Sequence, residues 1–257
     1  MGVVPLKFLL YEHAVTNAAR LAMFTRAAHG GGPRTLREDF SGTAALARAW
    51  LDLNPEHRAI AVDFDPSVTR HITARAHLRV VTADANACRA RADIIAATNF
   101  AMGYFHERAG LVAYLTRTRS RLPRGGVFMC DMYGGKGAWT AGMERVRVRV
   151  GNDPRVPRSF VYEWDQVSAD PATNLVENAI HFSWKKGGRT RRIDRAFTYH
   201  WRLWSIPELR DAVREAGFRG VDVYTRLADA VDHEGGVYVR PAESVDASWV
   251  VYVVARA

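Results

Sequence analysis

The sequence predicts an α/β fold, in which a doubly wound, mostly parallel sheet of seven strands carries an inserted antiparallel β cap. Two observations support this prediction. Between residues 35 and 132, five short and almost continuously apolar segments alternate with helical segments, which is typical of parallel strands buried on both faces. Between residues 160 and 204, aromatic and polar residues alternate instead, as in FVYEW and AFTYHW, which indicates antiparallel strands with one covered face.

The individual elements follow from local signals. A helix is expected over 11–28, because apolar residues recur there at helical spacing before a glycine run. The next elements are strands at 35–38, 58–63, 78–83, 92–98 and 127–132, with helices from 43, from 65 and over 108–121. About three strands fill 160–204. A helix at 205–217 then begins at the N-cap candidate Ser205 and ends at Gly217, and strands at 221–225 and 249–254 complete the sheet.

The expected organisation has three parts. Residues 1–32 form an N-terminal helical lid, residues 33–150 and 205–257 form the ligand-binding α/β domain, and residues 151–204 form the cap on the substrate side. No apolar run approaches the roughly 20 residues of a membrane span, and we expect no signal peptide. The two cysteines lie far apart, which favours a reducing, cytoplasmic location.

The net charge of +9 raises the question of nucleic-acid binding. Two basic clusters stand out, RVRVRV at 145–150 and KKGGRTRR at 185–192, but the other basic residues are spread along the chain. Nucleic acid is therefore a possible but not a favoured partner, and we expect a monomer or a homodimer. The nine histidines show no spacing typical of zinc ligands, so we expect no metal.

The stretch REDFSGT at 37–43 joins the first strand to the next helix, where open α/β folds hold ligands. A loop that binds phosphate needs backbone N–H groups and positive charge. The carboxylates of Glu38 and Asp39 would repel phosphate and suit a cation, such as an ammonium or a sulfonium. This chemistry points to S-adenosylmethionine as the cofactor and to S-adenosylhomocysteine as its product.

Five motifs occur in a recognisable order: EDFSGT, VDFDP, TADA, TNF and LPRGGVFMCDMY. In this order and spacing, the chain resembles the class I S-adenosylmethionine-dependent methyltransferases that act on small molecules, whose cofactor domain is Rossmann-like. The family usually has two or three glycines in the first loop, and this chain has only Gly42 there.

The resemblance implies a role for each motif residue. Asp63 is expected to bind the ribose hydroxyls, Phe64 to pack on the adenine, and Asp84, beside the Ala85 amide, to accept from the adenine amino group. Of the acidic pair, we slightly prefer Asp39 for the methionine ammonium. The full set of expected cofactor-binding residues is Glu38, Asp39, Gly42, Thr43, Asp63, Phe64, Asp84, Ala85, Asn99 and Phe100.

Asn99 and Tyr104 are expected near the transferring methyl group as catalytic residues. The expected substrate-binding residues are Tyr11, His13, Tyr133, Arg195, Tyr199 and Trp201. Several of these are aromatic, and aromatic faces hold cationic amines. Alternation places Tyr199 and Trp201 on one face of their strand.

These observations predict an enzyme that transfers a methyl group to a small molecule by in-line displacement, with nitrogen slightly favoured over oxygen as the acceptor. Two alternatives remain open. One is an RNA or protein methyltransferase, which the basic clusters motivate. The other is a repurposed cofactor-binding fold that performs ring closure or transfer of the aminocarboxypropyl group.

Overall fold

The computed structural model describes residues 4–15, 17–225, 227 and 239–257. The main sheet consists of β1 (Thr35–Asp39), β2 (Arg58–Asp63), β3 (Leu78–Thr82), β4 (Ile94–Ala97), β5 (Val127–Gly135), β10 (Gly220–Tyr224) and β11 (Ser248–Arg256). The second sheet consists of β6 (Gly142–Arg149), β7 (Ser159–Asp170), β8 (Leu175–Lys186) and β9 (Arg189–Arg202). The helices are α1 (Leu6–Val15), α2 (Ala18–His29), α3 (Ala45–Leu53), α4 (Pro66–Thr69), α5 (Arg108–Arg121) and α6 (Ile206–Glu215), with short 3₁₀ turns η1 (Ala101–Tyr104) and η2 (Lys136–Trp139).

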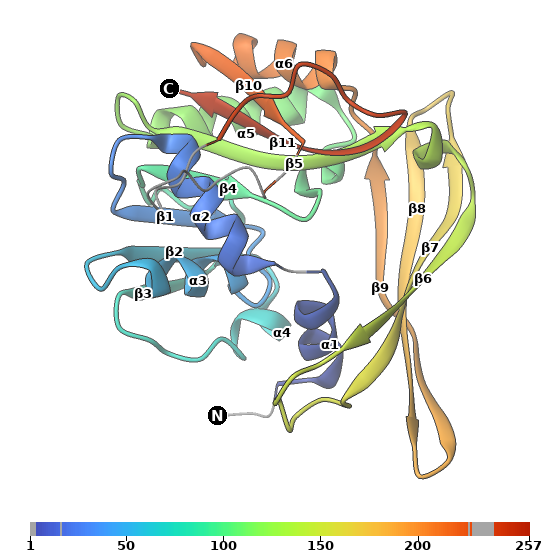
Figure 1. The fold of residues 1–257 in the computed structure, drawn as a ribbon. Coiled ribbons are helices and arrows are strands. Elements are labelled where there is room, and N and C mark those ends of the chain that lie inside the picture. The colour runs from blue at the N-terminus through green and yellow to red at the C-terminus, as the bar shows by residue number, and fades with distance from the viewer. Residues whose placement is uncertain (1–3, 16, 226, 228–238) are drawn as a thin grey trace.

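The main sheet has seven strands in the order β10-β11-β5-β4-β1-β2-β3, and the second sheet has the order β6-β7-β8-β9 (Figure 1). β1 to β5 run parallel, whereas β11 is antiparallel to both β5 and β10. The predicted fold class is therefore confirmed. β1 pairs with β2 on one side and with β4 on the other, so the strand order reverses at β1, and ligands bind at the carboxyl ends of strands at such a point.

Two predicted elements differ from the structure. The single helix expected over 11–28 is two helices, because Asn17 starts α2 as its N-cap and accepts a hydrogen bond from the Arg20 amide at 3.3 Å. The second sheet has four strands instead of about three, since β6 begins at Gly142, before the expected cap boundary at residue 151. The Arg and Val residues that were expected to form a basic cluster alternate along β6 with the period of a strand.

α1 lies between the two sheets and packs on the second (Figure 1). The rings of Phe8 and Tyr11 contact Phe197 of β9 at centroid distances of 5.7 and 5.1 Å. Lys7 Nζ donates to the Ala196 carbonyl at 3.4 Å. The N-terminal helix therefore forms one wall of the space that separates the sheets. In the described ranges, no helix is both long and apolar enough to span a bilayer.

A glycine at the end of β5 sets the close approach of β5 to β11. Gly135 has φ 86° and ψ −166°, and a Cβ there would lie 2.1 Å from the Ala247 carbonyl oxygen. We expect Gly135→Ala to lower the free energy of unfolding by about 1–3 kcal/mol, since only glycine adopts this backbone conformation readily. Urea unfolding measures it. Gly142→Ala is the control, because its Cβ would meet open space, and equal effects of the two changes would contradict this account.

Candidate active site

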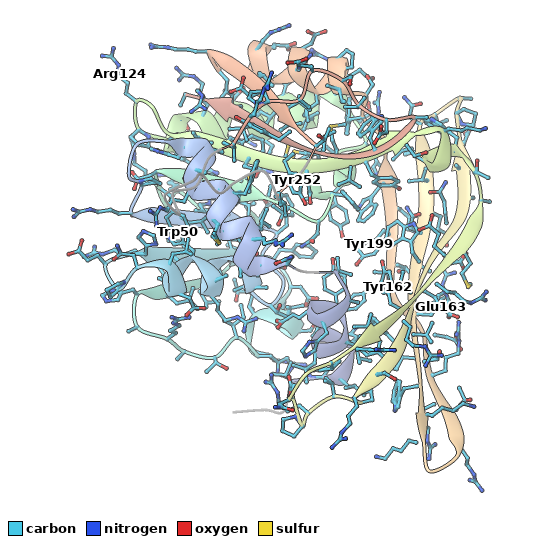
Figure 2. The ribbon with its side chains drawn as sticks, viewed as in Figure 1. Trp50, Arg124, Tyr162, Glu163, Tyr199 and Tyr252 are labelled. Atoms are coloured by element: carbon cyan, nitrogen blue, oxygen red, sulfur yellow. The ribbon has the colours of Figure 1, made fainter. Side chains whose placement is uncertain are left out.

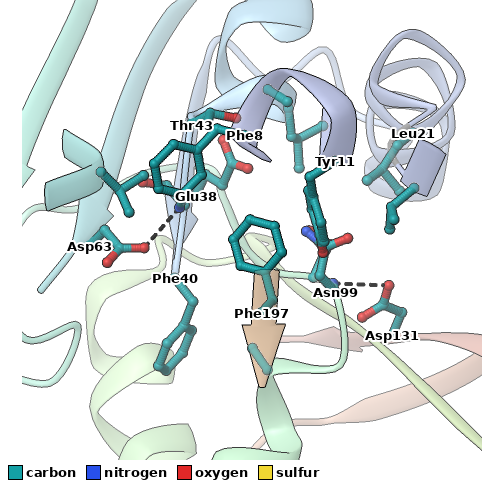
Figure 3. Close-up of a pocket in the computed structure, with 18 of the residues that line it drawn as sticks. Phe8, Tyr11, Leu21, Glu38, Phe40, Thr43, Asp63, Asn99, Asp131 and Phe197 are labelled. Atoms are coloured by element: carbon teal, nitrogen blue, oxygen red, sulfur yellow. Dashed lines mark hydrogen bonds between the residues drawn. The ribbon is translucent and has the colours of Figure 1, made fainter. Parts of the chain in front are cut away.

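A cavity of about 320 Å³ lies at the carboxyl ends of β1, β2 and β4 (Figure 3). Nine residues expected from the sequence line this first cavity: Tyr11, Glu38, Gly42, Thr43, Asp63, Phe64, Asn99, Tyr104 and Tyr199. They come from five segments of the chain that lie far apart in sequence. The fold therefore brings most of the expected cofactor residues to one place.

The loop after β1 turns with only one glycine because other residues adopt left-handed backbone conformations. Phe40, Gly42 and Ala44 have φ of 55°, 51° and 59°. A left-handed conformation costs non-glycine residues of order 1 kcal/mol or more. Phe40 and Ala44 thus replace the glycines missing from the loop. The Gly42 amide donates to Asp63 Oδ2 at 2.8 Å, which ties the loop to the end of β2 (Figure 3).

The two carboxylates of the acidic pair lie on opposite faces of β1, because side chains alternate along a strand. Glu38 lines the first cavity and accepts the Ala47 amide at 2.8 Å, at the N-terminus of α3. Burial raises the pKa of Glu38 to about 8, although the hydrogen bonds from the Ala47 and Leu46 amides oppose this increase.

Asp39, which we had preferred for the cationic group, lies 1% exposed on the other face and lines neither described cavity. Its Oδ1 accepts from Arg37 Nε at 2.6 Å, and its Oδ2 accepts from the Tyr114 hydroxyl at 3.0 Å. Arg37 and Tyr114 already satisfy the Asp39 carboxylate, and Glu38 is the member of the pair that faces the cavity.

The expected ribose and adenine residues lie along the neighbouring strand ends. Asp63 also accepts the Asp65 amide at 3.0 Å, which holds its carboxylate at the cavity wall. Phe64 is 71% exposed at the rim. Asp84 is exposed and accepts the Asn86 amide at 2.6 Å, and neither Asp84 nor the buried Ala85 is among the described residues that line the cavity.

A second cavity of about 940 Å³ lies between the main sheet and the second sheet. Six residues line both cavities and so form their junction: Tyr11, Val15, Asn99, Asp131, Tyr199 and Tyr252. Figure 2 shows Tyr162 and Tyr199 on the side of the second sheet that faces the main sheet. The expected residues Phe100, Tyr133 and Trp201 line this second cavity and not the first.

Stacked aromatic rings form one wall of the second cavity. Tyr199 and Trp201 have ring centroids 4.2 Å apart, and Trp164 stacks with Trp201 at 6.0 Å. The Tyr133 hydroxyl accepts from Asn178 Nδ2 at 3.1 Å. Such a wall provides a large apolar surface with a few hydroxyl groups, which is the usual lining of a small-molecule site.

Two expected substrate residues lie elsewhere. His13 Nε2 is 3.3 Å from Asp153 Oδ2, and the Arg195 guanidinium pairs with Glu177 at 2.6 Å. Neither lines a described cavity. Arg195 lies at an irregularity between β8 and β9, where the pairing of Ile180 with Phe197 passes to that of Phe182 with Ile193. The alternation of side chains between the two faces of β9 is therefore interrupted near Arg195. The sequence pattern carries no signal of this irregularity.

Asp131 lines both cavities, although it is not among the residues expected from the sequence. It lies in β5 and accepts the amides of Asn99 at 3.1 Å and Phe100 at 2.7 Å. Burial raises its pKa to about 6. The signal available in the sequence was a single carboxylate within the otherwise apolar run VFMCDMY, because buried carboxylates are rare unless they have a partner or a function.

The fold and the two joined cavities define a protein with the class I methyltransferase fold, and comparisons with solved structures support this assignment. A S-adenosylmethionine-dependent methyltransferase from Clostridium acetobutylicum superposes with a TM-score of 0.67 at 13% identity, with 96% of each chain covered. The sugar N-methyltransferase KedS8 from Streptoalloteichus gives 0.67 at 17% identity, covering 100% of this chain and 95% of that one.

CalS10, an amino pentose methyltransferase from Micromonospora echinaspora solved with S-adenosylmethionine, gives a TM-score of 0.69 at 15% identity, covering 100% of this chain and 99% of that one. At these identities the likeness establishes the fold. No family model and no curated protein matches the chain by sequence.

The raised pKa of Glu38 gives a test of its burial in the cofactor-free protein. The folded-state pKa of about 8 exceeds the ordinary value of 4.5, so the folded state keeps a proton that the unfolded state releases between these values. The free energy of unfolding should therefore fall as the pH rises from about 5 to 8, by an amount on the order of a few kcal/mol. Glu38→Gln should remove this part of the slope. Urea unfolding of both proteins at several pH values measures it, and parallel curves would contradict the burial of this carboxyl.

Proposed function

We propose that this protein transfers the methyl group of S-adenosylmethionine to a small-molecule acceptor, with nitrogen as the favoured acceptor atom. The observation that supports the proposal most strongly is the junction of the two cavities. The first cavity carries carboxylates at the ends of β1 and β2, and the second carries an aromatic wall. A cofactor in the first and an acceptor in the second would meet at the six residues that line both.

Each group of the cofactor has a matching residue in this proposal. Glu38 would face the methionine ammonium, and a cation beside it would favour its charged form. Asp63 would accept from the ribose hydroxyls, and the exposed ring of Phe64 would stack on the adenine. Asp84 is proposed for the adenine amino group, because the Ala83 amide next to it donates to the Asp63 carbonyl at 3.0 Å. Thr43 would contribute its hydroxyl to the methionine carboxylate.

The cofactor would supply an electrophilic methyl group on a sulfonium, which is a good leaving group. The protein would therefore mainly align the acceptor and exclude water. Asn99 and Tyr104 would line the path of the methyl group, because both lie at the first cavity and Asn99 also belongs to the junction. Tyr133, Tyr199 and Trp201 would hold the acceptor against the aromatic wall. The neighbours named as a sugar N-methyltransferase and an amino pentose methyltransferase favour nitrogen.

An RNA or protein acceptor is less favoured, since α1 and the second sheet both line the junction, through Tyr11 and Val15 of α1 and Tyr199 of β9. Transfer to a protein or RNA would need a continuous basic surface beside the site. Binding of RNA with an affinity that decreases steeply with added salt would support that alternative.

Mass spectrometry tests the proposed reaction. The protein is incubated with S-adenosylmethionine carrying a labelled methyl group and with a panel of small amines and their matching alcohols. We expect an amine to gain one labelled methyl group while S-adenosylhomocysteine forms. A product that has gained the aminocarboxypropyl group would indicate the repurposed chemistry instead. An alcohol that is methylated in preference to its matching amine would contradict nitrogen as the acceptor.

A further inference from the structure

Asp131 lies at the junction, where the two cavities meet. It is 7% exposed, and it lines both the first and the second cavity. Figure 3 shows its carboxylate beside Asn99, near the ring of Tyr11. Of the six junction residues, only Asp131 carries a carboxylate. A group at this point would contact both the methyl donor and the acceptor of the proposed reaction.

The hydrogen bonds of Asp131 fix its orientation and leave part of its capacity unused. Its two oxygens accept the amides of Asn99 and Phe100, whose left-handed φ values of 58° and 61° turn both N–H groups toward it. A carboxylate has about four acceptor positions, so about two remain for another partner. Within the described residues, no Lys, Arg or His forms a salt bridge with Asp131, and none shifts its pKa.

The described groups around Asp131 do not neutralise its charge. Lys136 lines the same second cavity, but it forms no salt bridge with Asp131 and does not contribute to the pKa shift of Asp131. Tyr11, Tyr199 and Tyr252 share the junction with it, and burial raises the pKa of each hydroxyl above its ordinary value, so all three stay neutral. The neighbouring Cys130 is buried and its pKa is also raised. An ionised carboxylate buried without a cation is costly. We therefore expect a bound ligand to supply the cation that pairs with the Asp131 carboxylate.

We infer that Asp131 binds the acceptor as an ammonium ion in the second cavity and then takes one of its protons. This inference rests on the proposed methyl transfer. The N–H bond breaks and its proton moves to a carboxylate oxygen of Asp131, which leaves the nitrogen lone pair free. That pair forms the new C–N bond as the C–S bond breaks, and the sulfur keeps the bonding electrons. The product leaves as the methylated ammonium ion, and Asp131 releases its proton to water.

Binding of two matched probes tests the inference. Benzylamine, a cation, and benzyl alcohol, which is neutral, both offer a ring for the aromatic wall, and their affinities are measured by titration calorimetry on protein saturated with S-adenosylhomocysteine. We expect the wild type to prefer benzylamine by roughly tenfold to a hundredfold, the contribution of a charge-assisted hydrogen bond. Asp131→Asn should abolish this preference. Glu144→Gln, the same chemical change at an exposed residue of the same cavity, should retain it.

Several outcomes would overturn the inference. The wild type could show no preference for benzylamine, or Glu144→Gln could reduce the preference as much as Asp131→Asn does, which would indicate only a general negative potential. Asp131→Asn could also weaken S-adenosylmethionine binding while leaving benzylamine binding intact, which would assign Asp131 to the cofactor. Failure of S-adenosylhomocysteine to bind would instead count against the proposed function, and the probes would then be compared on the free protein.

A titration of the wild type covers the case in which Asp131→Asn does not fold. Benzylamine stays cationic between pH 5 and 7, and Glu38 lines the first cavity but not the second, where the probes are expected to bind. The affinity for benzylamine should therefore fall as the pH decreases through about 6, the pKa of Asp131, while that for benzyl alcohol stays constant. For any amine that is methylated, kcat/KM should fall over the same range. An unchanged benzylamine affinity would overturn the inference.

Discussion

Replacing Arg37 by Met is expected to lower the free energy of unfolding by about 3–5 kcal/mol, because it leaves a buried carboxylate without its cation. The Arg37 and Asp39 side chains are both fully buried, and their ion pair measures 2.6 Å. The guanidinium also donates to the carbonyls of Cys88, Ala90 and Ala85 at 2.8–2.9 Å. Arg37 thus ties the loop after β3, which carries the expected adenine residues, to the centre of the sheet.

Urea unfolding of the variants measures this effect. Arg58→Met, at an exposed position of β2, is the matched control and should change the free energy of unfolding by less than about 0.5 kcal/mol. The double variant Arg37→Met with Asp39→Leu should regain part of the loss, since it removes both charges. The recovery is incomplete because the carbonyls of Cys88 and Ala90 lose Arg37 as their donor and the Tyr114 hydroxyl loses Asp39 as its acceptor. The Ala85 carbonyl keeps the donor Arg121. An Arg37→Met variant within about 0.5 kcal/mol of the wild type would show that the ion pair is not needed for folding.

Asp63→Ala is expected to weaken the binding of S-adenosylhomocysteine by roughly a hundredfold or more. Asp63 holds the Gly42 and Asp65 amides, which sets the path of the loop after β1. In the proposed function it also accepts from the ribose hydroxyls. Each hydrogen bond to a carboxylate contributes about 1.5–3 kcal/mol, so two lost bonds to the ligand account for a change of this size.

Titration calorimetry on both proteins, after circular dichroism has confirmed that they are folded, gives the affinities. Asp52→Ala provides the control, because Asp52 is exposed on α3 and pairs with Arg75 outside the cavity. Its affinity should equal that of the wild type. An affinity of Asp63→Ala within about threefold of the wild type, less than about 1 kcal/mol, would remove the ribose role from Asp63.

The sequence predicted the main sheet well where apolar runs end at clear turn signals. The strand expected over 58–63 is β2 with the same bounds, and the helix expected over 108–121 is α5. The Ser205 cap of α6 is also confirmed, as part of a capping box with Glu208. The split between α1 and α2 was missed because apolar spacing continues through Asn17, and only its capping side chain marks the boundary.

The site residues that lie at the carboxyl ends of the parallel strands could be predicted from the sequence. Strand alternation, applied to Arg37–Asp39, would have separated Glu38 from Asp39. The left-handed conformations of Phe40 and Ala44 have no comparable signal, because these residues rarely adopt them. The same holds for Asn99 and Phe100, which donate their amides to Asp131 of β5, 32 and 31 residues later in the chain.

The central claim is that the cavity at the ends of β1, β2 and β4 binds S-adenosylmethionine. Titration calorimetry of the wild type with S-adenosylmethionine and S-adenosylhomocysteine tests it most directly. We expect both to bind saturably, at one molecule per chain, and Asp63→Ala to weaken both. A wild-type protein that is folded and binds neither compound would contradict the claim.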